Sequence, residues 1–275
     1  MNPLAAAEGA FWRAFRKLAV QRQGLTQRRA LWPYCPVAPA RGLWQDDQTL
    51  TQLPEGMQMS PYSARRVMMV DTQVRPHDVT KFPIIEAMLA IPREVYVPSA
   101  KREAAYMGEN LALGGNRVML EARTLGKMLD ALDIQPGEKV LDLGCGLGYS
   151  AAVIARMAGT VVAVEEDEAM AAEAQAALAA EGVDNVTVIA GPLAAGCTKS
   201  GPYDAIAVQG GVETLPQALL DQLKDGGRIA ALFMDGALGA MKIGHKAGGK
   251  VVWRFAFNAA APVISGFATR HEFTF

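Results

Sequence analysis

The chain has 275 residues, a net charge of −1, 51% hydrophobic residues and 20% charged residues. This composition predicts a globular protein with a sizeable core, and the balanced charge argues against a nucleic-acid partner, which usually requires a basic excess. Three scattered cysteines and three scattered histidines provide no metal-ligand cluster and no disulfide framework, and no apolar run is long enough to span a membrane, so we expect no metal, no membrane partner and a reducing, cytoplasmic setting.

Residues 1–58 differ from the rest of the chain. Their first 30 positions hold six basic residues and one acidic residue, and a proline-rich stretch without periodicity follows. Three interpretations are open: a mis-called upstream extension with the natural start at Met57 or Met59, a disordered tail, or a basic amphipathic targeting helix. We favour the first, and we expect residues 59–275 to form a single domain.

The first part of that domain, residues 59–133, has the pattern of helices. Apolar residues recur at helical spacing over residues 84–89, and the pattern ends at Pro92. A second helix is expected at Thr124–Leu132, before Pro136. The sequence therefore predicts an N-terminal helical subregion.

Strand and helix patterns alternate over residues 134–275. Helices are expected at Tyr149–Met157, Glu168–Glu181 and Leu215–Leu223. Strands are expected at Lys139–Leu143, Thr160–Val164, Val186–Ala190, Tyr203–Val208, Arg228–Phe233, Lys250–Phe257 and Ser265–Phe275. This alternation predicts an α/β fold with a doubly wound, seven-stranded, mostly parallel sheet, whose last two strands pair antiparallel at one edge.

A glycine-rich turn follows the first of these strands. Gly144, Gly146 and Gly148 occupy alternate positions, and a helix is expected to begin near Tyr149. Such a turn lets a nucleotide-like ligand lie against bare backbone. The spacing differs from the GxGxxG of dinucleotide-binding proteins. Asp142 precedes the glycines, where it could accept a hydrogen bond from a charged amine or fix the turn.

An acidic residue, Glu165, ends the second strand of the sheet, 21 residues after Gly144. A carboxylate at this position can bind both hydroxyls of a ribose. The alternative is a solvated charge at a helix N-terminus, because Glu165 begins an acidic run that extends to Glu168. We favour the ribose role because of the position at the strand end.

These residues resemble S-adenosylmethionine-dependent, class I methyltransferases. More specifically, Ile91–Pro98 resembles the "VPRExFVP" segment of protein-L-isoaspartate O-methyltransferases, and Leu215–Arg228 resembles their "xIPxxLLxQLKPGGRL" segment. The resemblance extends from about Val70 to Lys250. It implies S-adenosylmethionine as the cofactor, with these candidate binding residues: Asp142, Gly144, Cys145, Gly146, Gly148, Tyr149, Glu165, Pro192 and Leu193.

The resemblance also implies a reaction, the methyl esterification of L-isoaspartyl carboxylates in damaged proteins or peptides. Two other interpretations stay open. The chain could be a divergent methyltransferase with another acceptor, or a protein that binds S-adenosylmethionine without transferring its methyl group. The sequence does not indicate an oligomeric state.

The sequence departs from the family in two places. The family's "GQTISQP" loop corresponds to Asn116–Ala122, where Val118 and Leu120 replace the threonine and the serine. No catalytic residue is therefore assigned. Pro192 replaces the acidic residue that contacts the adenine amino group, so we expect adenine to be held by backbone and apolar contacts near Leu193.

Two arginines and two further residues complete the candidates. Arg117 or Arg123 could hold a substrate carboxylate through paired hydrogen bonds, and the alternative for both is an exposed charge beside a helix. Cys145 is expected to be a small turn residue rather than a nucleophile, and His77 a surface residue.

Overall fold

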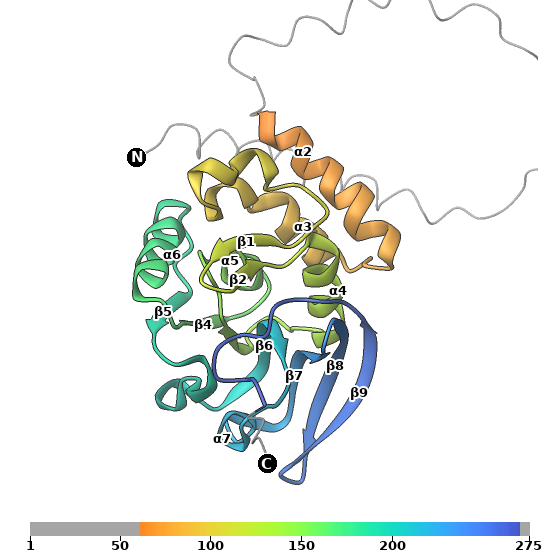
Figure 1. Cartoon of the computed structure of the whole chain (residues 1–275), viewed down its shortest axis with the longest axis vertical. Coiled ribbons are helices and arrows are strands. Elements are labelled where there is room, and N and C mark those ends of the chain that lie inside the picture. The colour runs from red at the N-terminus through yellow and green to blue at the C-terminus, as the bar shows by residue number, and fades with distance from the viewer. Residues whose placement is uncertain (1–60, 270–275) are drawn as a thin grey trace, which may run out of the picture. The chain divides into compact units, whose positions relative to one another are not determined.

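Seven strands form one sheet, and two further strands form a separate hairpin, in a computed structural model that describes residues 61–269 (Figure 1). The expectation for residues 1–58 lies outside this range and stays a prediction. The strand order is β5-β4-β3-β6-β7-β8-β9. The bounds are β3 Lys139–Leu143, β4 Thr160–Glu165, β5 Val186–Ala190, β6 Tyr203–Val212, β7 Leu223–Asp235, β8 Leu238–Ala247 and β9 Lys250–Asn258.

The sheet is mostly parallel, as predicted. Strands β5, β4, β3, β6 and β7 pair in parallel, whereas β7, β8 and β9 pair antiparallel and lie side by side at one end of the sheet (Figure 1). The parallel pairing brings the carboxyl ends of β3, β4 and β6 to one edge. Ligands bind at this edge in open α/β sheets.

Two details of the predicted strands were wrong. Strand β8 was not predicted, because glycines and lysines interrupt its apolar residues, although Gly236 and the pair Gly248–Gly249 flank it with positive φ angles. The predicted final strand at Ser265–Phe275 is not a strand in its described part, residues 265–269. Residues 263–269 instead lie along the carboxyl edge of the sheet, where Val263 pairs with Gly211 in a single parallel bridge and the Phe267 carbonyl accepts from the amides of Glu213 and Thr214.

Helices cover the two faces of the sheet unequally. Alternate residues of each strand point to opposite faces, so Val140 belongs to one apolar cluster and Leu141 to the other. The helix bounds are α2 Pro61–Met69, α3 Phe82–Ala90, α4 Ala122–Leu132, α5 Tyr149–Ala155, α6 Glu168–Ala180 and α7 Gln217–Leu220. The first cluster includes residues of α3, α4, α5 and α6, and the second includes residues of α7, of a 3-10 turn and of the segment around Phe267.

The N-terminal part is helical except for a hairpin that the sequence analysis did not predict. Its strands are β1, Leu111–Gly114, and β2, Arg117–Met119, joined by a turn in which Gly115 and Asn116 have positive φ angles. The Asn116 side-chain amide donates to the carbonyl of Val263 over 2.7 Å. Asn110, just before β1, donates to the carbonyl of Ala260 over 2.7 Å. The hairpin is therefore attached to the segment that crosses the carboxyl edge.

Arg228 of β7 ties the sheet to the end of α4. Its guanidinium donates to both carboxylate oxygens of Glu138, over 2.6 and 2.8 Å, and also to the carbonyls of Leu132 and Asp133. Both side chains of the ion pair are largely buried. The guanidinium thus satisfies carbonyls at the helix C-terminus that have no partner within the helix.

We expect Arg228→Met to lower the free energy of unfolding by about 2 kcal/mol, because Glu138 loses its ion-pair partner and two carbonyls lose their side-chain donor. Urea denaturation measures this loss. The matched control is Arg254→Met on the exposed side of β9, which we expect to change stability by less than about 0.5 kcal/mol. Equal midpoints for Arg228→Met and the wild type would contradict the role of Arg228.

Candidate functional site

The glycine-rich turn forms a bare loop between β3 and α5. Gly144, Gly146 and Gly148 have φ angles of +77°, +56° and +98°, a region that residues with a Cβ rarely adopt. Gly148 is the N-cap residue of α5, and the Gly144 amide donates to the carbonyl of Val164 over 2.7 Å. The alternate spacing of the glycines therefore has a conformational cause.

Glu165 ends β4 beside this loop and is fully buried. Its carboxylate accepts hydrogen bonds from the backbone amides of Gly146 at 2.7 Å, Glu166 at 3.0 Å and Asp167 at 3.5 Å. The interpretation of Glu165 as a solvated helix-end charge was wrong. Asp167 has the capping role instead, because its side chain accepts from the amide of Met170 at the start of α6.

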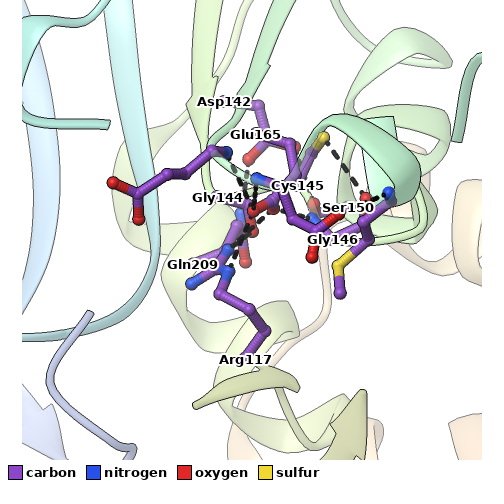
Figure 2. A network of polar contacts seen from close by, with 11 residues as sticks. Arg117, Asp142, Gly144, Cys145, Gly146, Ser150, Glu165 and Gln209 are labelled. Carbon is purple, nitrogen blue, oxygen red and sulfur yellow. Dashed lines mark hydrogen bonds and ion pairs between the residues drawn. The ribbon is translucent and has the colours of Figure 1, made fainter. Parts of the chain in front are cut away.

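Arg117 of β2 points into the site and contacts Glu165 (Figure 2). Its Nε and Nη2 atoms lie 3.2 and 3.1 Å from the two carboxylate oxygens, and Nη2 also donates to the Gly144 carbonyl. The Arg117 side chain is 7% exposed, so the alternative of an exposed charge was wrong. Arg123, in contrast, is half-buried on α4 and pairs with Glu121 over 2.7 Å.

Asp142 is buried at the end of β3, with both carboxylate oxygens engaged (Figure 2). The Ser150 hydroxyl of α5 donates to one oxygen over 2.6 Å, and the Gln209 amide of β6 donates to the other over 2.7 Å. Burial raises the pKa of Asp142 to about 6. These contacts tie three elements together at the loop, which supports the turn-fixing role.

The other candidates lie around this centre. Cys145 is buried in the loop, and burial raises the pKa of its thiol, which disfavours a nucleophilic thiolate. The Tyr149 ring lies under the guanidinium of Arg93, 4.8 Å from the ring centroid.

Pro192 is exposed and Leu193 is buried after β5. Gly191, just before them, donates its amide to the Glu165 carbonyl over 2.9 Å, so this segment lies beside the end of β4. His77 is half-buried, and its ring contacts the carbonyl of Gln73 at 3.0 Å.

Gln209 was not predicted as a site residue. One signal was available, because Gln209 is a lone amide in an otherwise apolar run at the end of a parallel strand. The hairpin was not predicted either, although Gly114, Gly115 and Asn116 between two short apolar stretches are a local turn signal. That Leu113 reaches the loop depends on how the hairpin packs, which no local pattern indicates.

Only a small cavity remains between the hairpin and the loop. Its volume is about 10 Å³, the lower limit for one water molecule, whereas ligand pockets measure about 300–1,000 Å³. The hairpin side of this cavity is apolar, formed by Leu113, Val118, Met119 and Leu120. Within residues 61–269, no cluster of side chains could hold a metal ion, and no helix has the length and hydropathy to cross a membrane.

The raised pKa of Asp142 predicts a pH-dependent stability. The folded protein binds this proton at about pH 6 and the unfolded chain only at about pH 4. The wild type therefore gains stability as the pH falls from 7 through 6 towards 4, whereas Asp142→Asn lacks this contribution. We expect a relative gain of about 1–3 kcal/mol for the wild type, measured by urea denaturation of both proteins across this range. A pH-independent difference between them would contradict the prediction.

Comparisons with known proteins bear on the family. The family model described as Protein-L-isoaspartate(D-aspartate) O-methyltransferase matches residues 65–255. The chain is 39% identical over 168 residues to Protein-L-isoaspartate O-methyltransferase 1 of Rhodopseudomonas palustris, covering 61% of this chain and 69% of the relative. It is 38% identical over 164 residues to the Protein-L-isoaspartate O-methyltransferase of Methylorubrum extorquens, covering 60% and 72%.

Solved structures agree on the fold. A protein-L-isoaspartate O-methyltransferase superposes with a TM-score of 0.64 at 24% identity, covering 73% of this chain and 66% of that chain. A putative enzyme of the same name from Plasmodium falciparum, in complex with S-adenosyl-L-homocysteine, superposes with a TM-score of 0.63 at 16% identity, covering 74% and 98%. The class I methyltransferase-like fold and the family resemblance are thereby confirmed: the chain belongs to the protein-L-isoaspartate(D-aspartate) O-methyltransferase family.

Proposed function

We propose that this protein is an S-adenosylmethionine-dependent methyltransferase that esterifies the free carboxylate of L-isoaspartyl residues in proteins or peptides. The observation that carries the proposal is the buried carboxylate of Glu165 at the end of β4, beside a loop of three left-handed glycines. Family membership supports the same reaction. The scattered cysteines support action in the cytoplasm.

Each element of the site has a role in this proposal. Glu165 would accept hydrogen bonds from the ribose hydroxyls, and the backbone of residues 144–148 would let the cofactor approach closely. The segment around Pro192 and Leu193 would pack against adenine, because it lies beside the end of β4. Asp142 would hold the loop in place through Ser150 and Gln209.

The chemistry makes modest demands on the protein. When bound, the cofactor supplies a methyl group on a sulfonium ion, which is already activated. A carboxylate acceptor is ionised at neutral pH, so no general base is required. The residues of the site therefore contribute by aligning the acceptor and excluding water.

Glu165 and the glycine loop fit the proposed cofactor, but two side chains of the hairpin occupy the space over the loop. The guanidinium of Arg117 lies where a Cβ on Gly144 would be, and Leu113 Cδ1 would lie 2.6 Å from a Cβ on Gly146. We use the term cradle for the glycine loop together with the carboxylate of Glu165. Arg117 and Leu113 of the hairpin thus fill this cradle. Cofactor binding on this loop requires these two side chains to move.

A second candidate function is favoured by the apolar lining of the hairpin. Val118 and Leu120 line the cavity and offer no hydroxyl to an isoaspartyl carboxylate. A methyltransferase with a less polar acceptor would fit this lining. A protein that binds the cofactor without transferring its methyl group is the remaining alternative.

Incubation with methyl-labelled S-adenosylmethionine and paired peptides tests the main proposal. We expect base-labile label in an isoaspartyl peptide and none in the matching aspartyl peptide. We expect Glu165→Gln to lose this transfer, because an amide cannot accept at both of its heteroatoms, with circular dichroism as the check of folding. Label confined to other acceptors would support the second candidate, and cofactor binding without any transfer would support the third.

The departures in the hairpin give a second test. We expect Val118→Thr with Leu120→Ser to raise turnover of the isoaspartyl peptide by about tenfold or more, since one misplaced positioning group can cost about 10²-fold. Steady-state kinetics with the labelled donor measure this gain. The matched control is Val67→Thr on the exposed side of α2, which should leave turnover unchanged. No gain in the folded double variant would contradict an isoaspartyl acceptor.

A further inference from the structure

One basic side chain lies on the carboxylate that the cofactor is expected to use. Arg117 places two of its nitrogens on the two oxygens of Glu165 (Figure 2). The same guanidinium donates to the carbonyl of Gly144, the first residue of the glycine loop. Arg117 therefore contacts both parts of the cradle, the acidic strand end and the bare loop.

The carboxylate has no need of Arg117 as a hydrogen-bond donor. Backbone amides of Gly146, Glu166 and Asp167 already donate to it, and such donors stabilise a buried carboxylate. The ion pair is also incomplete, because the buried Nη1 atom of Arg117 has no hydrogen-bond partner. A guanidinium that leaves one buried donor unpaired is poorly matched to a permanent structural role.

The hairpin that carries Arg117 is packed unevenly. β2 is three residues long and buries Met119 in the core, whereas its partner β1 alternates half-buried with exposed residues. Polar contacts hold β1 and the turn: Asn116 donates to the Val263 carbonyl, and Lys101, next to the hairpin, donates to the Ala112 carbonyl over 2.6 Å. Such contacts at the surface exchange readily with water.

We propose that Arg117 gates the cofactor site. In the closed state it holds Glu165 and fills the cradle, and the cofactor's ribose binds in competition with this ion pair. The inference rests on the proposed function for the identity of the ligand, but not on the identity of the acceptor. A competitor inside the chain lowers the apparent affinity by the fraction of molecules that are open.

Calorimetric titration with S-adenosylhomocysteine tests the gate without any methyl transfer. We expect Arg117→Met to bind this probe about tenfold or more tightly than the wild type, because methionine fills similar space without competing for the carboxylate. Arg117→Lys keeps the charge but loses the planar fork, so its affinity should lie between the two. The control is Arg102→Met, which removes an exposed charge elsewhere and should bind as the wild type does.

A second readout separates the gate from a structural role. The probe should raise the melting temperature of Arg117→Met by more than it raises that of the wild type, because ligand stabilisation follows affinity. A residue that only supports the fold would leave this shift unchanged or reduce it. If Arg117→Met does not fold, Arg117→Gln serves for both measurements, since it also removes the charge.

The relative affinities of Arg117→Met and the wild type for S-adenosylhomocysteine decide whether Arg117 is a gate. Tighter binding by Arg117→Met, whether or not the wild type binds measurably, supports the gate. Equal binding by both proteins, or no binding by either folded protein, overturns it. The proposed function fails separately, if the probe binds but isoaspartyl peptides accept no methyl group.

Discussion

The carboxylate of Glu165 is the constraint on which the rest of the site depends. A fully buried charge is costly unless donors surround it, and the chain provides them from three directions: the glycine loop, the start of the α6 segment and the hairpin. Parallel pairing of β3 with β4 brings the loop to this carboxylate. The left-handed glycines then allow the Gly146 amide to point at it. The burial of the Glu165 charge thus depends on both the pairing of β3 with β4 and the left-handed glycines.

This arrangement explains why the site can be both stable and closed. The hairpin places a cation and an apolar side chain against Glu165 and the loop, where the cofactor of the proposed function would place its ribose. The same carboxylate can serve an internal or an external partner, since both satisfy its oxygens. Which partner prevails depends on a difference between two sets of hydrogen bonds, and such differences amount to a few kcal/mol. Under the proposed function, Val118 and Leu120 would face the acceptor rather than Glu165.

Local sequence patterns predicted the features that neighbouring residues determine. The glycine loop, Glu165 at a strand end and the helices before and after β3 follow from spacing and from turn chemistry. The burial of Arg117 and the bond from Gln209 to Asp142 could not be predicted, because each depends on elements far apart in the chain. Arg117 and Glu165 are 48 residues apart, and Asp142 and Gln209 are 67 apart. The mistaken strand after Ser265 has a similar cause, since the carboxyl edge holds that segment in place rather than a neighbouring strand.

The segment that crosses the carboxyl edge has a consequence for synthesis of the protein. Asn110 and Asn116 bond to carbonyls that lie 150 and 147 residues later in the chain. During translation the loop, Glu165 and the hairpin all leave the ribosome before these carbonyls exist. Closing such long loops slows folding, and the two asparagines can make these bonds only after β8 and β9 have been synthesised. The nascent chain therefore passes through a stage in which the glycine loop and Glu165 are present but the hairpin lacks its two bonds to the C-terminal segment.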